Sequence, residues 1–264
     1  MNKEHYDMPV VILAGGMGTR LAEETSLRPK PMVEIGGVPI AVHIMDWYSK
    51  YGFRNFILAS GYMSSYIKEY FANFHLKNSD LDINLATGKI DVLDKKTIDW
   101  QVKVIDTGLS TNTGGRLLRL KKYLSDSDFM ITYGDGLANV DLNHLSSVHV
   151  ETKAVTTITS VRPPARFGAI NFDGHHVKSF HEKPNSSEGW INGGFMRATP
   201  ELFNFIEGDS SILEHDIFPK LARENKLATH KHDDFWHPMD TLRDKNLLEK
   251  MWRDGDMYWA DSKK

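Results

Sequence analysis

The chain has 264 residues, with 32 Lys and Arg against 35 Asp and Glu, a formal net charge of −3 and no cysteine. This charge balance gives no electrostatic footprint for a nucleic acid or a membrane surface, and the lack of cysteine excludes disulfides and Cys-based metal sites. The first residues lack an apolar signal core, and no apolar run approaches membrane-spanning length. We therefore expect a cytoplasmic protein in which any anion is bound locally.

Short β-rich apolar runs alternate with helical periodicity through the first half of the chain, which is typical of a mainly parallel sheet flanked by helices. The predicted strands lie at 10–14, 53–59, 100–106 and 128–133, and the predicted helices at 39–51, 64–74 and from Gly114 to about Tyr123. Pro39 can open the first of these helices, and Gly52 can end it.

From Lys153 onward, turns punctuate the strands, so the second half of the chain predicts a smaller antiparallel β portion. Its predicted strands lie at 154–161, 168–172, 175–180 and 227–232, and its predicted helices at 200–206, 212–225 and 242–252. Asp173-Gly174 is a hairpin signal. Because no repeat, low-complexity tract or linker interrupts the chain, we expect one fused unit over residues 1–264.

A glycine-dense loop follows the first predicted strand, in the segment Leu13-Ala14-Gly15-Gly16-Met17-Gly18-Thr19-Arg20, and Arg28-Pro29-Lys30-Pro31 comes soon after. Glycines let the backbone approach an anion, and the amide N–H groups then form a cradle for it. The spacing is neither the Gly-x-Gly-x-x-Gly of dinucleotide folds nor a Walker-type loop. A plain glycine turn is the alternative, but the cations Arg20 and Lys30 would repel each other without an anion between them.

Two carboxylates are candidate metal ligands. Asp135, in Tyr133-Gly134-Asp135-Gly136, follows the apolar run 129–132 and so lies at the carboxyl edge of a predicted strand, where open α/β sheets bind ligands. Asp240 lies at a predicted loop-to-helix junction. Turn formation and helix capping are the alternative roles of these two residues. Mg²⁺ on nucleotide phosphates commonly takes one or two carboxylates, so the pair suits a magnesium site.

Two further segments combine glycine with polar groups. Ser110-Thr111-Asn112-Thr113-Gly114-Gly115-Arg116 opens a predicted helix, where it could either contact a base or ribose or simply cap the helix through Thr113. Asn192-Gly193-Gly194-Phe195 permits close ligand approach, whereas Glu182-Lys183-Pro184 could also be a solvated surface pair. The 12 histidines lack metal-ligand spacing.

Taken together, these motifs resemble those of the sugar-1-phosphate nucleotidyltransferases. The resemblance rests on the glycine loop, on Arg28-Pro29-Lys30-Pro31-Met32, on Gly134-Asp135-Gly136 and on Glu182-Lys183-Pro184. Further blocks are similar to the cytidylyltransferase branch of that family, namely Glu23-Glu24-Thr25, 106–108, 113–116, 166–169, 191–195 and 235–245. The matching blocks spread from residue 10 to about residue 252.

The resemblance implies a Rossmann-like α/β fold with a mixed, mainly parallel sheet, and CTP and α-D-glucose 1-phosphate as substrates, with Mg²⁺ as cofactor. CDP-glucose and diphosphate would be the products, and CDP-glucose would feed dideoxysugar synthesis for bacterial O-antigen. Residues of about 10–150 would bind the nucleotide, and those of about 151–264 would bind the sugar phosphate and form a homo-oligomer, with a hexamer expected.

The same resemblance assigns residues to roles. The expected catalytic residues are Arg20, Lys30 and Asp135, and the expected magnesium ligands are Asp135 and Asp240. The expected nucleotide contacts are Leu13, Ala14, Gly15, Gly16, Gly18, Thr19, Arg20, Lys30, Ser110, Thr113, Gly114, Gly115, Arg116 and Gly134. The expected sugar-phosphate contacts are Gly168, Glu182, Lys183, Asn192 and Gly193.

Departures from the family pattern cluster near the predicted sugar half. Arg197 and Ala198 stand where apolar strand residues are expected, and His181 stands where a glutamine is expected. Another sugar 1-phosphate therefore remains an alternative. UTP or dTTP in place of CTP is a second alternative, because the sequence does not show which group faces the base, and a non-catalytic sugar-nucleotide sensor is a third. Joint retention of Lys30, Asp135 and Asp240 argues against the sensor, which could dispense with them.

Overall fold

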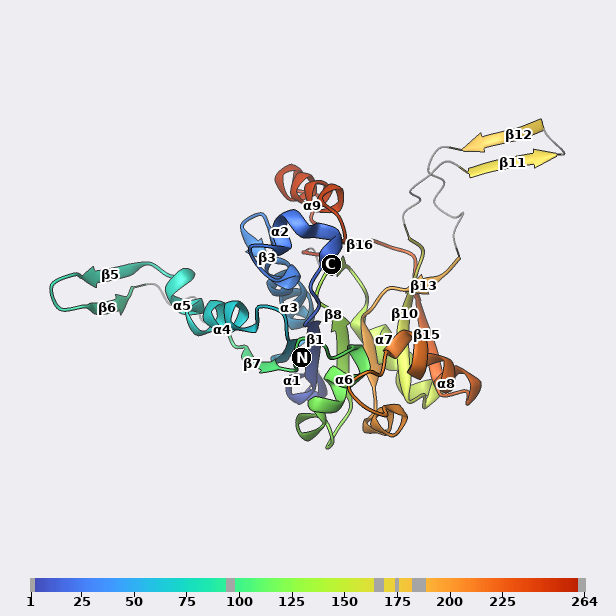
Figure 1. The fold of residues 1–264 in the computed structure, drawn as a ribbon, viewed down its shortest axis with the longest axis horizontal. Coiled ribbons are helices and arrows are strands. Elements are labelled where there is room, and N and C mark those ends of the chain that lie inside the picture. Colours follow the sequence, from blue (N-terminus) through green and yellow to red (C-terminus); the bar gives the residue numbers. More distant parts are fainter. Residues whose placement is uncertain (1–2, 94–97, 164–168, 174–175, 182–188, 261–264) are drawn as a thin grey trace.

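One large sheet forms the centre of the molecule in the computed structural model (Figure 1), which describes residues 3–93, 98–163, 169–173, 176–181 and 189–260. Its strands lie in the order β15-β10-β14-β8-β1-β4-β7, and β13 pairs with β10 beside β14. Their bounds are β1 Pro9–Ala14, β4 Asn55–Ser60, β7 Gln101–Asp106, β8 Phe129–Tyr133, β10 Thr156–Val161, β13 Ile191–Asn192, β14 Met196–Ala198 and β15 Leu227–His232.

The sheet is mainly parallel, as predicted. The pairs β1–β4, β1–β8, β4–β7 and β10–β15 are parallel, whereas β14 runs antiparallel to both β8 and β10. The predicted strand 227–232 coincides with β15, but the antiparallel strand β14 was not predicted because Arg197 interrupts its apolar pattern. Arg197 is only 5% exposed, and its guanidinium donates a 2.9 Å hydrogen bond to Asp128. The carboxylate therefore allows a charged residue inside the sheet.

Helices cover both faces of the sheet, as the alternating pattern predicted. On β1, Val10 and Ile12 face one apolar cluster, and Val11 faces the other. The first cluster includes side chains of α3 (Ile40–Lys50), α4 (Ser64–Ala72), α7 (Leu142–Thr152) and α9 (Leu242–Asp254). The second includes side chains of α6 (Thr113–Arg119), η4 (Pro200–Phe205), η5 (Leu213–Ile217) and α8 (Phe218–Arg223).

The helix bounds differ from the predictions in informative places. The predicted helix 212–225 is divided into the wide turn η5 and α8, with Pro219 in the first turn of α8. Helix α7 was not predicted, because its Ser, His, Thr and β-branched residues have modest helix propensity. The cap that marks its start is Asp141, whose side chain accepts hydrogen bonds from the backbone N–H groups of Asn143 and His144.

Shorter elements complete the chain. They are α1 Lys3–Asp7, η1 Thr19–Leu21, α2 Ala22–Thr25, η2 Lys30–Met32, β2 Glu34–Ile35, β3 Val38–Pro39, α5 Phe74–Lys77, β5 Leu81–Asn84, β6 Lys89–Val92, η3 Lys121–Tyr123, β9 Gly136–Ala138, β11 Ala169–Asp173, β12 His176–His181 and β16 Trp236–Pro238. The hairpins β5–β6 and β11–β12 extend away from the central sheet (Figure 1). The second of them is the antiparallel pair expected around Asp173.

A small antiparallel pair brings two distant parts of the chain together at the site. Strand β16 pairs with β9, and the backbone N–H of Met239 donates a 2.8 Å hydrogen bond to the carbonyl oxygen of Asp135. Asp240 is thereby placed next to the loop that follows β8, although the two aspartates are far apart in sequence. In the described part of the chain, no helix combines the length and apolar character needed to cross a bilayer.

Candidate active site

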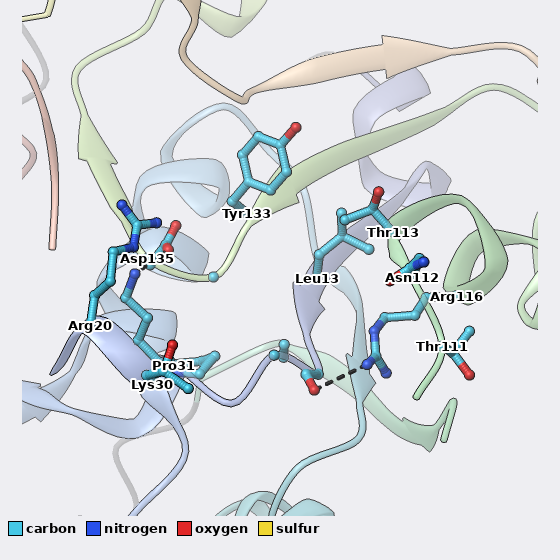
Figure 2. A pocket seen from close by; sticks show the side chains of 16 residues that line it. Leu13, Arg20, Lys30, Pro31, Thr111, Asn112, Thr113, Arg116, Tyr133 and Asp135 are labelled. Carbon is cyan, nitrogen blue, oxygen red and sulfur yellow. Dashed lines mark hydrogen bonds and ion pairs between the residues drawn. The ribbon is translucent and has the colours of Figure 1, made fainter. Parts of the chain in front are cut away.

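A cavity of about 360 Å³ lies at the carboxyl ends of β1 and β8 (Figure 2). It is lined by Leu13, Ala14, Gly15, Gly16, Gly18, Thr19, Arg20, Lys30, Pro31, Thr111, Asn112, Thr113, Arg116, Tyr133, Gly134 and Asp135. The two strands are parallel neighbours, with Leu13 opposite Tyr133, so both loops leave the sheet at the same edge. The cavity therefore joins the glycine loop and the Asp135 loop.

The glycine loop owes its shape to two different restrictions. Gly18 has φ +63°, and a β-carbon there would lie 2.8 Å from the methyl group of Thr25. The hydroxyl of Thr25 also donates a 3.1 Å hydrogen bond to the carbonyl oxygen of Gly18. At Gly15, a β-carbon would lie 2.1 Å from Cζ of Arg116. Larger residues at 15 or 18 would thus deform the loop.

Arg116 supports this loop through its guanidinium, which is part of a side chain only 5% exposed. It donates hydrogen bonds of 3.0 Å to the carbonyl oxygen of Gly15, 2.7 Å to Oγ1 of Thr107 and 2.8 Å to the carbonyl oxygen of Gly108. Burial, and then the neighbouring Arg119, lower the pKa of Arg116. Its predicted role was nucleotide contact, and the structure places it at the cavity as a clamp between loops.

The charged groups gather at one end of the cavity. Nζ of Lys30 lies 2.6 Å from Asp135 and 2.7 Å from Asp240, and Nη1 of Arg20 lies 2.9 Å from Asp240. Burial alone would lower the pKa of Lys30, but the two aspartates outweigh it and raise that pKa. The side chain of Lys30 is 11% exposed, whereas that of Arg20 is 71% exposed and ion-paired with Asp240. Lys30 is therefore a fixed cation, and Arg20 is an adaptable one.

The same end of the cavity fits a divalent cation. The carboxylate oxygens of Asp135 and Asp240 both approach the ammonium group of Lys30, so they are close enough together to serve as ligands of one cation. Among the described residues, no group of three or more His, Asp or Glu could hold a metal by itself. A cation such as Mg²⁺ would then complete its shell with substrate phosphate and water, as is usual for that ion.

Some predicted site residues lie elsewhere. Ser110, Gly114 and Gly115 do not line the cavity, and the two glycines instead pack against the backbone of residues 209–211. Asn192 and Gly193 lie beyond Tyr133, since Asn192 hydrogen-bonds the Tyr133 hydroxyl at 3.0 Å. Gly168, Glu182 and Lys183 fall outside the described residues.

Four lining residues were not among the predicted site residues, namely Pro31, Thr111, Asn112 and Tyr133. Each is adjacent in sequence to a predicted one. Thr111 and Asn112 belong to the polar run that opens α6, and Tyr133 is the last residue of β8. The position of Tyr133 directly before Gly134 and Asp135 was the signal that could have identified it.

A family model described as nucleotidyl transferase matches residues 9–261, which is nearly the whole chain. The chain belongs to the nucleotidyl transferase family. It is 45% identical over 253 residues to the glucose-1-phosphate cytidylyltransferase of Salmonella typhi, covering 96% of this chain and 98% of that one. It is 41% identical over 255 residues to the probable glucose-1-phosphate cytidylyltransferase of Bacillus subtilis, covering 96% and 99% of the two chains.

Solved structures support the fold of this nucleotidyl transferase. The crystal structure of HddC from Yersinia pseudotuberculosis aligns with a TM-score of 0.69 at 24% identity, covering 93% of this chain and 99% of that one. A structure of the same Yersinia protein complexed with GMP-PN aligns with a TM-score of 0.66. At this level of identity the likeness concerns the α/β architecture alone.

Proposed function

We propose that this nucleotidyl transferase converts CTP and α-D-glucose 1-phosphate into CDP-glucose and diphosphate. Two relatives more than 40% identical over 96% of the chain carry the name of that activity or its probable form. The observation in the site that carries the proposal is Lys30, held between Asp135 and Asp240 at one end of a glycine-lined cavity.

The reaction requires alignment and charge neutralisation. An oxygen of the sugar phosphate forms a bond to the α-phosphorus of CTP, and the bond from that phosphorus to the bridging oxygen of diphosphate breaks. Because the attacking oxygen is already anionic near neutral pH, no proton has to be removed by a general base. Fixed cations and close positioning supply the main acceleration of such a displacement.

We assign Lys30 to the α-phosphate, where negative charge develops, and Arg20 to the departing diphosphate. The buried position of Lys30 suits the first role, because a fixed cation in a water-poor site stabilises charge without reorganising. The exposed side chain of Arg20 suits the second role, because the leaving group must also depart. Lys183, which lies outside the described residues, stays our prediction for the sugar phosphate.

Enzymes of this family generally use a divalent metal. We propose Mg²⁺ as that metal, with Asp135 and Asp240 as its protein ligands. When bound, the ion would neutralise charge on the nucleotide phosphates. The protein's own residues hold the two aspartates close together. Lys30 contacts both carboxylates, and the backbone N–H of Met239 donates a hydrogen bond to the carbonyl oxygen of Asp135.

The test is diphosphate release by the purified protein with each nucleoside triphosphate and a panel of sugar 1-phosphates, with and without Mg²⁺. We expect the highest kcat/KM with CTP and glucose 1-phosphate. A different preferred pair would replace the substrate assignment, and tight nucleotide binding without turnover would favour a sensor.

Lys30→Ala tests the assigned role of that lysine in the same assay. We expect kcat to fall by about a hundredfold to a thousandfold, by analogy with the loss of one transition-state hydrogen-bond donor. Lys89→Ala, on the exposed hairpin β5–β6, is the matched control, since Lys89 forms an exposed ion pair there with Asp91. Near-normal turnover by Lys30→Ala would remove Lys30 from the mechanism.

Assembly into a homohexamer, a cytoplasmic location and a place in O-antigen dideoxysugar synthesis stay proposals that rest on family likeness. Light scattering coupled to size-exclusion chromatography tests the first of them. A mass of six chains is expected, and the mass of a single chain at working concentration would contradict the proposal.

A further inference from the structure

A carboxylate outside the predicted site connects two walls of the cavity. One oxygen of Glu214, in η5, accepts a hydrogen bond from the Tyr133 hydroxyl. Its other oxygen accepts a 3.2 Å hydrogen bond from the hydroxyl of Thr113. Thr113 and Tyr133 both line the cavity, and they come from α6 and β8, respectively. Glu214 thus joins two lining residues that are not neighbours in sequence.

The Tyr133 hydroxyl also lies on the path to the predicted sugar half. It accepts a 3.0 Å hydrogen bond from Nδ2 of Asn192, and Oδ1 of Asn192 in turn accepts a 3.1 Å hydrogen bond from the backbone N–H of Gly194. Figure 2 shows the Tyr133 ring between the Arg20, Lys30 and Asp135 group and the Thr111 to Arg116 segment. The ring therefore lines the same cavity as both of these groups.

The hydrogen-bond directions in this cluster are settled by chemistry. A carboxylate is an acceptor only, so Thr113 and Tyr133 must both donate to Glu214. Burial, and then the charge of Glu214, raise the pKa of Tyr133, so its hydroxyl keeps its proton throughout the working range of an enzyme. The proton of each hydroxyl is thus committed to Glu214 and is not available to a ligand.

The Tyr133 ring has little freedom to move away from this position. Gly194 has φ +78°, and a β-carbon there would lie 3.0 Å from Cδ2 of Tyr133. The backbone of residue 194 therefore packs closely on the ring. On the other side, Oγ1 of Thr113 accepts a 2.9 Å hydrogen bond from the backbone N–H of Leu213, which attaches η5 to the start of α6. The exposed residue Glu214 completes the connection by accepting hydrogen bonds from both Tyr133 and Thr113.

We propose that Glu214 is a positioning residue for the transfer reaction, holding Thr113 on the nucleotide side and Tyr133 on the sugar-phosphate side in one fixed relationship. The inference rests on the proposed function, because it assumes that the nucleotide contacts Thr113 and that the sugar phosphate lies on the side of Tyr133 and Asn192. Loss of Glu214 releases the Tyr133 hydroxyl and loosens the wall that faces the sugar phosphate. The second substrate then binds less tightly, whereas Lys30 and Asp135 are unaffected.

The test is steady-state kinetics of Glu214→Ala, Glu214→Gln and Tyr133→Phe with the substrate pair that the wild-type protein turns over best. For Glu214→Ala we expect the KM for the sugar 1-phosphate to rise about tenfold, the equivalent of one hydrogen bond to a charged group, with a much smaller change in kcat. Glu214→Gln keeps one acceptor oxygen and should recover part of the loss. A merely structural role would lower the stability of the protein and the amount of active enzyme, and would not raise one KM selectively.

A double-mutant cycle decides whether Glu214 acts through Tyr133. Because both variants remove the same hydrogen bond, the double variant Glu214→Ala/Tyr133→Phe should have the KM of the worse single variant. The proposal would be overturned if the KM increase in the double variant were the product of the two single increases, or if KM were unchanged in Glu214→Ala. His215→Gln, an exposed neighbour in the same turn, should behave as wild type. Because the assay uses the pair that the panel identifies, failure of the glucose 1-phosphate assignment remains separate from failure of this inference.

Discussion

The guanidinium of Arg116 donates a 3.0 Å hydrogen bond to the carbonyl oxygen of Gly15, so a side chain of α6 supports the loop that follows β1. The same guanidinium also bonds Thr107 and Gly108, after β7. It also donates a 3.2 Å hydrogen bond to the carbonyl oxygen of Ser60, the last residue of β4, so one charged group ties together three segments at one edge of the sheet. The close approach is possible because residue 15 has no side chain.

Replacing Arg116 with lysine should destabilise the protein and weaken nucleotide binding together. Lysine keeps the charge but cannot reach several acceptors in the planar geometry of a guanidinium. Buried carbonyl oxygens would lose their partners, at a cost of about 2 kcal/mol in the free energy of unfolding. Urea unfolding and the KM for CTP measure the two effects. Arg119→Lys, three residues further along α6 and ion-paired with Asp209 at the surface, should change neither.

The two adjacent glycines of the loop should respond differently to alanine. In Gly15→Ala the new methyl group would collide with Arg116, whereas at Gly16 a β-carbon would meet nothing within 4 Å. We expect Gly15→Ala to lower the urea midpoint and the turnover markedly, and Gly16→Ala to keep the wild-type midpoint. Circular dichroism during urea unfolding compares the pair. Equal midpoints for the two variants would show that Arg116 moves aside at little cost.

The sequence predicted the parts of the site that depend on local chemistry. Asp135 was identified because it follows an apolar run, and Lys30 because it is one of two cations close behind the glycine loop; the loops after β1 and β8 meet at one edge of the sheet. What local reasoning could not supply was the partner of each group. Asp240 was expected as a metal ligand, and the structure shows that it also shares the ammonium group of Lys30, 210 residues away in sequence.

Tertiary packing explains why some predicted nucleotide contacts do not line the cavity. Gly114 and Gly115 stand next to hydroxyls at a helix start, which favoured ligand contact. In the structure, a β-carbon at Gly115 would lie 2.4 Å from the backbone of Asp209, so that glycine is needed for close packing of α6 on a distant loop. Glu214 shows the converse, because the fold alone brings this exposed glutamate, which belongs to no predicted site motif, into contact with the lining residues Tyr133 and Thr113.

Removal of the metal and loss of each aspartate should have different effects on the Mg²⁺ dependence of activity. We expect chelation by EDTA to abolish diphosphate release. Asp240→Asn should raise the Mg²⁺ concentration for half-maximal activity by roughly tenfold or more, with activity recovered at high Mg²⁺. Asp135→Asn should recover less, because Asp135 lines the cavity itself and its neutral amide is a poorer ligand. The exposed control Asp91→Asn should leave the Mg²⁺ dependence unchanged. Identical Mg²⁺ curves for wild type and Asp240→Asn would contradict a metal role for Asp240.

The acid side of the stability profile should depend on a buried histidine far from the cavity. His230 is 4% exposed, and neither of its ring nitrogens has a hydrogen-bond partner among the residues that the structure describes. Burial, followed by the neighbouring His144 and His232, lowers the pKa of His230 to about 4, against a partial opposing effect of Asp141. The folded protein therefore keeps this ring neutral down to about pH 4.

The unfolded chain binds a proton on the same ring at about pH 6.5, so between about pH 6.5 and about pH 4 the unfolded state holds more protons than the folded state. The free energy of unfolding must then fall as the pH is lowered through this window, by about 3 kcal/mol at most from His230, and no further below it. His230→Leu should remove this part of the slope and cost little at neutral pH, because no hydrogen bond of the ring is lost. Urea unfolding across the window measures both curves, with exposed His215→Gln as the control. Parallel curves for wild type and His230→Leu would mean that the ring takes up a proton without unfolding, through movement of His144 or His232.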